Sequence, residues 1–451
     1  MAAGSRPNLA RVIRDVEDRH PGQVEFHQAV REVFRDVLPL VTANVVYRDE
    51  EIVKRIVEPD RVVSFRVVWQ DDAGARHVDQ GWRIQHSNAL GPYKGGLRFR
   101  GGLTEGVLRF LAFEQTFKNS LTGLPIGGAK GGATFEPRGR SSDEIMRFCQ
   151  AFMTELHRYI GPDRDIPAGD IGVGAREIDY LFGHYRRLAG RSDGGLTGKG
   201  MLLGGSALRA EATGYGVILF TDAMLHQAGE ALDGRSLAIS GSGNVALHAA
   251  AKAIALGGRV LTLSDSDGFI HDPDGIDAEK LAWIIDLKRN RRGRIADYAA
   301  EARRAVYHRG RSPWGTPCDI ALPCATQNEL DADDVATLAG NGAMAIVEGS
   351  NMPCTAAALC DIRKRRLLFG PGKAANAGGV AVSAMELAQN ATGIPWPTPD
   401  LPRRLGDVMS AIHDRCVDDG RGPGRRIDYL RGANIAAFRK VADAIVATGV
   451  G

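Results

Sequence analysis

A lysine surrounded by glycines is the first feature of this 451-residue sequence that could do chemistry. The segment GLPIGGAKGG, residues 123–132, holds Lys130. Glycine costs chain entropy, so such a run indicates backbone that turns tightly or passes close to a ligand. The nearest motif, the phosphate-binding P-loop, needs Ser or Thr directly after the lysine. Gly131 stands there instead, so Lys130 must serve another purpose.

Other charged or polar residues stand in similar surroundings. Lys94 lies in GPYKGGLRF and Asp170 in GPDRDIPAGDIGVG, while FEQTFKNSL carries Gln115 and Lys118 on one helix face. Cations that converge suit a small dianion such as a dicarboxylate. A lysine that is desolvated or near other cations has a lowered pKa and can act as acid or base near neutrality, and Asp170 could move a proton. Each residue alone could be a solvated or turn residue, but their clustering favours a site.

A dinucleotide-binding pattern occupies residues 236–268, SLAISGSGNVALHAAAKAIALGGRVLTLSDSDG. A predicted strand runs into Gly241, Gly243 and Ala246, a helix follows, and a second strand ends near Asp265. The first glycine permits the turn, the second lets backbone approach a pyrophosphate, and the small third residue allows close helix–strand packing. The helix N-terminus supplies N–H groups for the phosphates. Together with the charged cluster, this pattern indicates a dehydrogenase with an anionic substrate.

The choice between NAD and NADP depends on the residues at the end of the second strand. Asp265 could accept hydrogen bonds from a ribose 2′-hydroxyl, which favours NAD. Ser264 and the basic segment LKRNRRGR, residues 287–294, could instead hold a 2′-phosphate, with Lys288 as the nearest cation. That segment could also be a solvated helix end. We expect NADP, with NAD as the less favoured cofactor.

Two different textures predict two domains in an α/β protein, since the chain exceeds one ordinary core. Before residue 200, strands predicted at 61–70 and 81–87 are followed by three glycine-rich loops, with helices at 114–121 and 141–160. After it, short buried strands alternate with helices as in βαβ units. These later strands are predicted at 236–240, 259–264, 319–323, 344–349 and 366–372.

Composition and charge exclude several classes of function. A net charge of +3 gives no support to nucleic-acid binding, which usually shows a dense basic face. Six cysteines without a CxxC pair suit reduced thiols better than a disulfide framework or a zinc site, and we expect no metal. No apolar run approaches the roughly 18 residues that span a bilayer. The first twenty residues read as an amphipathic surface helix, so we expect a cytoplasmic protein with no membrane partner.

Longer strings of the sequence resemble one family. GPYKGGLRF, FEQTFKNSLTGLPIGGAKGG, IGPDRDIPAGDIGVGAREI, RAEATGYG, ALPCATQNEL and PGKAANAGGVAVSAMELAQN are similar to the small hexameric glutamate dehydrogenases, in the same order along the chain. The departures are modest: Ala210 stands where proline is usual and Ser350 where alanine is common, and residues 100–106 and 381–390 also differ. None removes a residue with a catalytic role.

The resemblance implies a role for each candidate residue. Lys130 would be the catalytic lysine and Asp170 its proton-transfer partner, while Lys94 and Ser383 would hold the side-chain carboxylate of the substrate. The α-carboxylate end would be bound by Gln115, Lys118 and the backbone at Gly169, and the cofactor by Thr213, Asn244 and Asn376.

The resemblance also implies an architecture and a reaction. A substrate-binding and oligomerisation domain with a mixed sheet would span residues 1–203, with a C-terminal helix at 425–451 packing back on it. A Rossmann-type domain would span 204–424, with a cleft between the two. The reaction would be the reversible oxidative deamination of L-glutamate to 2-oxoglutarate and ammonia with NADP, in a homohexamer.

Two alternatives stay open. A sister dehydrogenase for branched-chain or aromatic amino acids should lack Lys94, which would meet an apolar side chain. A non-catalytic nucleotide-binding regulator should have lost Lys130 or Asp170, and both are present.

Overall fold

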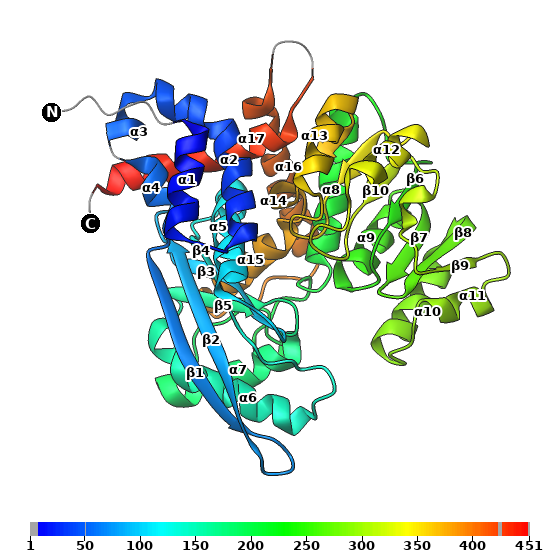
Figure 1. Ribbon diagram of the computed structural model, residues 1–451. Helices are drawn as coiled ribbons and strands as arrows, with labels where there is room; N and C mark the ends of the chain where they lie inside the picture. Colours follow the sequence, from blue (N-terminus) through cyan, green and yellow to red (C-terminus); the bar gives the residue numbers. More distant parts are fainter. Residues whose placement is uncertain (1–7, 50, 423–425, 450–451) are drawn as a thin grey trace. The chain divides into compact units, whose positions relative to one another are not determined.

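The structure is a computed structural model that describes residues 8–49, 51–422 and 426–449 (Figure 1). The described residues form two compact units, each treated by itself below. Unit 1 runs to Arg209 and adds Val380–Asp400 and the residues from Asn434 on, and unit 2 comprises Ala210–Gly379 and Leu401–Ala433. Helix α1 spans Leu9–Arg19, and residues 1–7 of the expected N-terminal helix lie outside the described part.

The units differ from the expected division at residues 380–400, which the sequence assigns to the nucleotide-binding domain but which pack within unit 1. This segment holds most of α15, Gly378–Thr392, whose Glu386 forms a buried ion pair with Lys199. The C-terminal helix α17, Tyr429–Thr448, also reaches unit 1, where Asp443 accepts a hydrogen bond from Tyr47. Residues 425, 450 and 451 of the expected C-terminal helix lie outside the described residues. Local sequence patterns cannot reveal contacts between segments that are so far apart in the sequence.

A mixed sheet forms the centre of unit 1, as expected. Its described strands run in the order β1-β2-β4-β3-β5; β2 pairs antiparallel with β1 and β4, and β3 pairs parallel with β4 and β5. The strands are β1 (Arg61–Gln70), β2 (Arg76–Ser87), β3 (Tyr93–Phe99), β4 (Gly128–Ala133) and β5 (Asp165–Gly169). The other helices of unit 1 are α2 (Val24–Ala43), α3 (Val45–Asp49), α4 (Ile52–Val57), α5 (Glu105–Thr122), α6 (Ser142–Leu156) and α7 (Ala175–Ala189), with short 3₁₀ turns at His157–Tyr159 and Met201–Leu203.

Each of the three segments predicted as a glycine-rich loop contains a strand, so the prediction was wrong for those residues. They form β3, β4 and β5, which lie next to one another in the sheet. Glycine is depleted in strands because it offers no side chain to pack. Here its absence of a side chain is what allows the packing: a Cβ on Gly95 would lie 1.6 Å from the carbonyl oxygen of Ala129.

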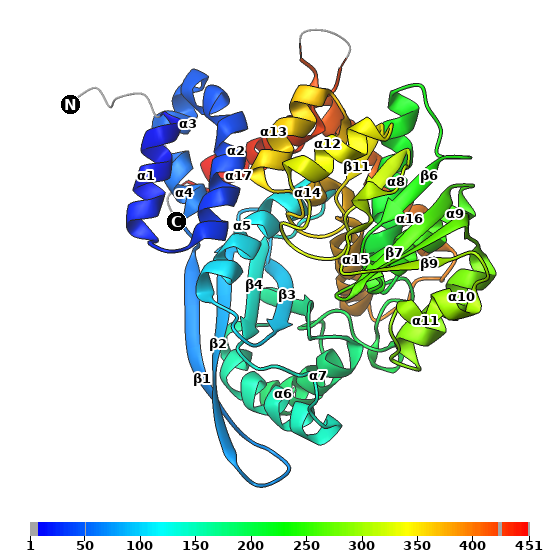
Figure 2. The same cartoon turned by 45° about the vertical axis from the view of Figure 1, so that its right-hand side comes forward.

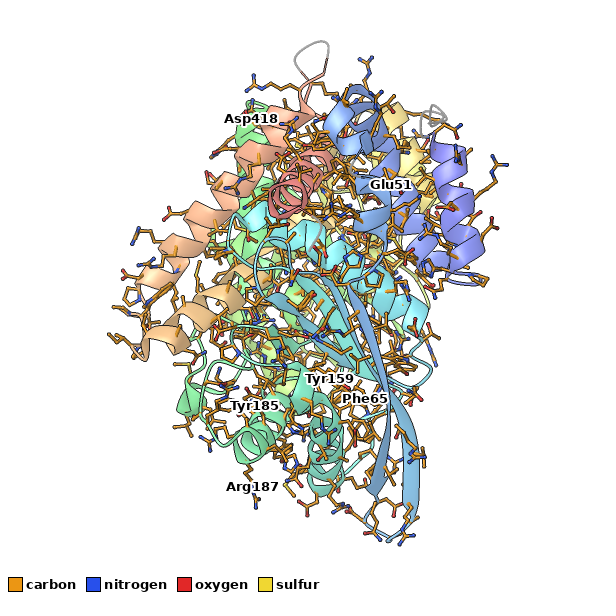
Figure 3. The ribbon with its side chains drawn as sticks, turned by 90° about the vertical axis from the view of Figure 1, so that its left-hand side faces the viewer. Glu51, Phe65, Tyr159, Tyr185, Arg187 and Asp418 are labelled. Atoms are coloured by element: carbon orange, nitrogen blue, oxygen red, sulfur yellow. The ribbon has the colours of Figure 1, made fainter. Side chains whose placement is uncertain are left out.

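Helices cover the two faces of this sheet. On one face, Leu97 and Phe99 of β3 pack with α6 and α7 in a core rich in aromatic side chains. Phe65 of β1, labelled in Figure 3, joins this core with its ring 5.2 Å from that of Phe152. On the other face, Ile84 of β2 packs against Leu108 of α5. The sheet therefore has a face covered by α6 and α7 and a face covered by α5.

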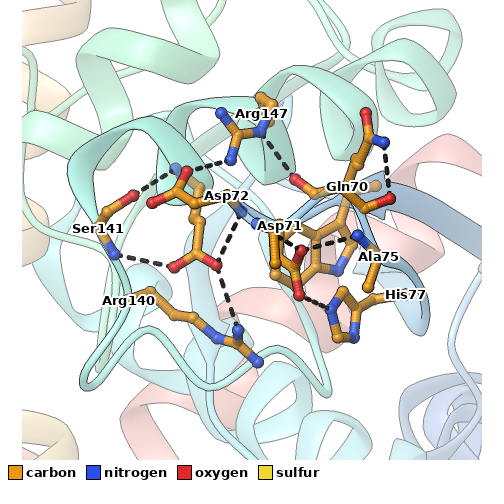
Figure 4. Close-up of polar contacts among 12 residues, drawn as sticks. Gln70, Asp71, Asp72, Ala75, His77, Arg140, Ser141 and Arg147 are labelled. Carbon is orange, nitrogen blue, oxygen red and sulfur yellow. Dashed lines mark hydrogen bonds and ion pairs between the residues drawn. The ribbon is translucent and has the colours of Figure 1, made fainter.

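The turn between β1 and β2 is fastened to the start of α6 (Figure 4). Arg147 donates to the Asp72 carboxylate at 2.5 Å and to the carbonyl oxygen of Gln70 at 2.7 Å. A capping box at Ser141 begins α6 beside this turn. These contacts fix the far end of the hairpin.

Unit 2 contains a predominantly parallel sheet of the expected doubly wound kind (Figure 2). Its described strands run in the order β12-β11-β10-β6-β7-β8-β9, parallel from β12 to β7 and antiparallel at β8 and β9. Those strands are β6 (Ser236–Ile239), β7 (Arg259–Asp265), β8 (Gly268–Ile276), β9 (Val306–Arg309), β10 (Ile320–Leu322), β11 (Ala345–Val347) and β12 (Leu368–Gly370). The helices of unit 2 are α8 (Ala212–Gln227), α9 (Asn244–Ala255), α10 (Ala278–Arg289), α11 (Ala296–Glu301), α12 (Ala332–Gly340), α13 (Ala356–Arg365), α14 (Gly372–Ala375) and α16 (Asp400–Gly420), with a 3₁₀ turn at Pro313–Gly315. All five strands predicted after residue 200 are present.

Candidate active site

The charged residues of unit 1 share one face of its sheet. Side chains alternate along a strand, so Lys94 and Arg98 of β3 lie on the same face. Arg98 pairs with Gly132 across the β3–β4 ladder, which places Lys130 of β4 on that face too. Ile84 pairs with Lys130 and packs against α5. We call this side, which α5 covers, the lysine face.

Asp170 lies between two cations on the lysine face. It follows β5 directly, and its Oδ1 is 3.1 Å from Nζ of Lys130 while its Oδ2 accepts a 2.6 Å hydrogen bond from Nε of Arg98. Gly96 makes the room for this group, since a Cβ there would lie 2.9 Å from Cβ of Asp170 and 3.3 Å from Nζ of Lys130. The structure thus brings the predicted catalytic pair together.

The contact of one carboxylate with two buried cations affects the pKa values of both Asp170 and Lys130. Burial opposes ionisation of Asp170, but Lys130 and Arg98 outweigh it and hold the pKa of the carboxyl well below its usual range. Burial lowers the pKa of Lys130, and the charge of Arg98 lowers it further while Asp170 opposes the change. The pKa of Lys130 is therefore lowered from its usual alkaline range, whereas Asp170 is held in its charged form.

Lys94 and Ser383 meet through a residue that the sequence analysis missed. Nζ of Lys94 donates to Oγ1 of Thr197 at 2.6 Å, and that hydroxyl is 2.6 Å from Oγ of Ser383 on α15. All three side chains are buried. Burial lowers the pKa of Lys94 to about 7, against the raising effect of Glu386. The hydroxyl groups of Thr197 and Ser383 therefore form a chain that begins at an amine whose pKa lies near neutrality.

Helix α5 supports this group from the lysine face. Asn119 donates to the carbonyl oxygen of Lys94 at 3.1 Å, and Gln115 donates to Asn119 at 2.6 Å. Lys118, one helical turn from Gln115, is buried. Gly169 lies in the β3–β5 ladder, where a Cβ would lie 2.5 Å from the carbonyl oxygen of Val173 in the turn that carries Asp170.

Sequence reasoning missed Arg98 and Thr197 for different reasons. Arg98 lies in the segment GPYKGGLRF. Once this segment is known to contain a strand, the alternation of Lys94, Gly96 and Arg98 places Arg98 on the same face as the lysine. Thr197 is a single threonine whose partners are 103 and 186 residues away, so no local signal could have found it.

Unit 2 presents the turn expected to hold a dinucleotide. Gly241 follows β6 with a φ of +85°, which favours glycine, and α9 begins at Asn244 after Gly243 without a side-chain cap. Among the residues that the structure describes, no heavy atom beyond the adjacent residues lies within 4 Å of the position that a Cβ on Gly243 would take. The turn before α9 therefore leaves open space at Gly243, and a helix N-terminus of this kind suits a pyrophosphate.

The other predicted cofactor residues of unit 2 gather near this turn. Asn244 donates to the carbonyl oxygen of Ala210, two residues before α8 begins with Ala212 and Thr213. Gly378 packs on Ala212, where a Cβ would lie 2.1 Å from its carbonyl oxygen, and this brings Asn376 close.

Asn376 itself provides a test of whether a ligand fits. Its Nδ2 donates to the carbonyl oxygens of Gly349 and Ser350, while its buried Oδ1 has no hydrogen-bond partner in the described part of the chain. A buried acceptor without a partner is costly, and a ribose hydroxyl would satisfy it. The residues present therefore fit a dinucleotide.

The residues expected to bind near the ribose 2′-position of the cofactor already form hydrogen bonds or ion pairs within the protein. Oγ of Ser264 accepts the N–H of Gly241 at 2.7 Å and keeps its own hydrogen to donate. Asp265 accepts the N–H groups of Asp267 and Ile295, so both of its oxygens support the loop. Lys288 lies 3.7 Å from the Asp265 carboxylate. This arrangement leaves donors and a cation, rather than a free carboxylate, at the end of β7.

In the described parts of the chain, no group of three or more His, Cys, Asp or Glu side chains is arranged to hold a metal ion. Nor does any helix within residues 8–49, 51–422 and 426–449 have the length and apolar character needed to cross a membrane.

The fold and site define an amino-acid dehydrogenase. The model for the Glu/Leu/Phe/Val dehydrogenase dimerisation domain matches residues 59–187, and the model for Glutamate/Leucine/Phenylalanine/Valine dehydrogenase matches residues 204–449. These two matches cover more than half of the chain, which belongs to this family.

Full-length relatives narrow the comparison. The chain is 51% identical to the NADP-specific glutamate dehydrogenase of Salmonella typhimurium over 98% of its own length and 99% of the relative's. It is 46% identical to the NAD-specific glutamate dehydrogenase of Bacteroides fragilis over 98% of its length and all of the relative's. The crystal structure of Plasmodium falciparum glutamate dehydrogenase superposes with a TM-score of 0.95 at 43% identity, covering 98% of this chain and 95% of that one.

Proposed function

We propose that this protein is a glutamate dehydrogenase that interconverts L-glutamate with 2-oxoglutarate and ammonia, using NADP. The observation that carries the choice of substrate is the buried amine of Lys94, joined by Thr197 to Ser383 on the same face as Lys130 and Asp170. A dehydrogenase for leucine, valine or phenylalanine would have to bury this amine against an apolar side chain, with no substrate carboxylate to balance its charge.

The residues of unit 1 divide the work. Lys94 and Ser383 bind the side-chain carboxylate, and Lys118, Gln115 and the backbone at Gly169 bind the α-carboxylate end. Lys130, with its lowered pKa, gives and takes the proton at the water that adds to Cα. Asp170 keeps the Lys130 amine in position and moves protons to and from the substrate nitrogen, and holding these groups together contributes much of the rate.

The residues of unit 2 hold the cofactor. The start of α9 at Gly241, Gly243 and Asn244 binds the pyrophosphate, and Thr213 and Asn376 lie toward the nicotinamide end. Ser264 and Lys288 bind the 2′-phosphate, with Asp265 shaping the loop around it. Held by these residues, NADP would supply the hydride acceptor and donor for the substrate Cα. NADP is favoured because the Salmonella relative is named for it and because both Asp265 oxygens already bind backbone N–H groups.

The oligomeric state and location follow from similarity. The first matched model is named a dimerisation domain, and the family resemblance extends to hexamers, so we propose a homohexamer assembled through unit 1 that acts in the cytoplasm.

The test is an initial-rate assay of the purified protein. Reduction of 2-oxoglutarate with ammonium should proceed with NADPH and much more slowly with NADH, while the 2-oxo acids of leucine, valine and phenylalanine should be poor substrates. Turnover of the apolar 2-oxo acids at a rate equal to that of 2-oxoglutarate would contradict the assignment of Lys94. Binding of NADPH without any turnover would indicate the non-catalytic regulator.

A further inference from the structure

A buried ion pair lies on the opposite side of the strands that carry the two lysines. Arg83 of β2 pairs with Gly131 in the β2–β4 ladder, and Asp165 of β5 pairs with Tyr93 in the β3–β5 ladder. Lys130 and Lys94 are the neighbours of Gly131 and Tyr93 in their strands, so they point to the other face. The side chains of Arg83 and Asp165 are both fully buried, at 0% exposed.

Arg83 connects three strands through a fixed set of hydrogen bonds. Its Nε donates to Oδ2 of Asp165 at 2.9 Å and its Nη2 to Oδ1, so the pair is bidentate. Its Nη1 donates at 3.0 Å to the carbonyl oxygen of Gly95, the residue directly after Lys94. Gln85 donates to Oδ2 of Asp165 at 2.9 Å. The guanidinium therefore holds the backbone beside Lys94 as well as its own carboxylate partner.

The glycine after Lys130 makes room for this side chain. A Cβ on Gly131 would lie 3.0 Å from Cδ of Arg83 and 2.8 Å from Cδ2 of Leu97. On its way from β2 to β5, the Arg83 side chain passes over the strand that carries Lys130. The glycines flanking Lys130 are thus explained in part by an arginine on the opposite face.

Stability alone does not account for the pair. A buried ion pair can often be replaced by apolar residues of similar volume without loss of stability, because desolvation offsets the attraction. What apolar residues cannot provide is a donor for the Gly95 carbonyl, which Arg83 supplies. Burial is the main cause of the lowered pKa of both Lys94 and Lys130. Glu386 opposes the change at Lys94, where the charges of Arg209, Arg83 and Lys199 lower the pKa further. Asp170 opposes the change at Lys130, where Arg98 and, to a smaller extent, Arg83 lower the pKa further.

We propose that Arg83, held by Asp165, is a positioning residue for the proposed reaction. Through the carbonyl oxygen of Gly95 it fixes the strand backbone beside Lys94, and its guanidinium, on the opposite face of the same strands, places a positive charge behind the two lysines. This rests on the roles proposed above for the two lysines.

The test compares a variant that leaves the positive charge of Arg83 unbalanced with a variant that removes both charges of the pair. Asp165→Asn keeps the shape of the side chain but leaves Arg83 without a counter-charge, whereas the double variant Arg83→Gln, Asp165→Asn removes both charges. Arg147→Gln is the matched control, because Arg147 is an arginine of the same unit that contacts the hairpin turn instead (Figure 4). Melting curves identify the variants that fold.

The readout is the pH at which each lysine becomes reactive in the ligand-free protein. Acetic anhydride labelling over a pH series, resolved by peptide mass spectrometry, gives a midpoint for Lys94 and for Lys130 without requiring turnover. Asp165→Asn should move both midpoints down by about half a pH unit or more, since one opposite charge has been lost nearby. The double variant should move them back up, to or above the wild-type values, and Arg147→Gln should leave them unchanged.

Two further results complete the design. In the pH profile of kcat/KM for 2-oxoglutarate, Arg83→Lys, which keeps the charge, should stay closer to wild type than the double variant does. Folded variants with lowered melting temperatures but unchanged midpoints would overturn the proposal and leave the pair a purely structural one. A wild-type protein without glutamate dehydrogenase activity would overturn the proposed function instead, while the labelling midpoints would still report on Arg83.

Discussion

Binding of a dicarboxylate should draw a proton into the protein through Lys94. The amine is buried, and burial lowers its pKa to about 7. A carboxylate that binds beside it stabilises the charged form and raises that pKa. In the free protein at about pH 8, roughly nine-tenths of the amine is neutral, so binding should take up close to one proton, whereas at about pH 6 the amine is already charged and uptake should be near zero.

The same reasoning gives the size of the effect on affinity. Each pH unit above the pKa of Lys94 reduces its charged fraction about tenfold, so dicarboxylate affinity should fall by about 1.4 kcal/mol per unit. Calorimetric titration with glutarate, in buffers that differ in ionisation enthalpy, measures both the affinity and the protons taken up. Lys94→Met should bind weakly and lose the proton uptake, which separates Lys94 from the nearby Lys130. If Lys94→Met took up as many protons as wild type at about pH 8, the reasoning would be refuted.

Other substitutions test other parts of the structure. Asp170→Asn should lower kcat by about 10²-fold or more, the usual cost of a lost acid–base group, with NADPH affinity unchanged; near-normal kcat with a lowered melting temperature would make Asp170 a structural residue. Lys288→Ala should weaken NADPH binding roughly tenfold to a hundredfold and leave NADH binding alone, so an unchanged preference would remove Lys288 from the site. Gly96→Ala should lower kcat/KM because its Cβ would lie 3.3 Å from Nζ of Lys130, and steady-state kinetics that match wild type would show that the pair can adjust. His86 is buried with a pKa lowered by burial to about 3, so the unfolded chain binds its proton first and stability should fall by about 1.4 kcal/mol per unit as pH drops below about 6.5. Denaturant unfolding of His86→Asn should show a shallower decline, and an equal slope would contradict this reasoning.

Most of the fold could be predicted from local pattern. The segment at 61–70 alternates apolar and polar side chains, and the structure has β1 over those residues. The short buried runs after residue 200 were found in the same way, because branched and aromatic residues fit a pleated surface. The glycine-rich strands could not be found, since their pairing depends on close approach between backbones, as at Gly95 and Ala129, and not on side-chain pattern.

The candidate site could be predicted as a set of residues but not as an arrangement. Local motifs singled out Lys94, Lys130 and Asp170, and the structure brings the last two within 3.1 Å. The link from Lys94 to Ser383 runs through Thr197, which joins segments that only the tertiary fold brings together. Long-range contacts of this kind leave no trace in a single sequence.

The charges on the lysine face indicate why the site accepts a dianion. Lys94, Arg98 and Lys130 are buried cations, and Asp170 is the carboxylate that contacts two of them. Uncompensated positive charge is costly to bury. The lowered pKa of Lys94 and of Lys130 lessens this cost, because it favours the neutral form of each amine. A bound dicarboxylate would supply two negative charges, and a carboxylate beside Lys94 would raise the pKa of that amine and favour its charged form. The free site is therefore held in a state that a doubly charged substrate completes, and an apolar amino acid, with one carboxylate fewer, leaves it incomplete.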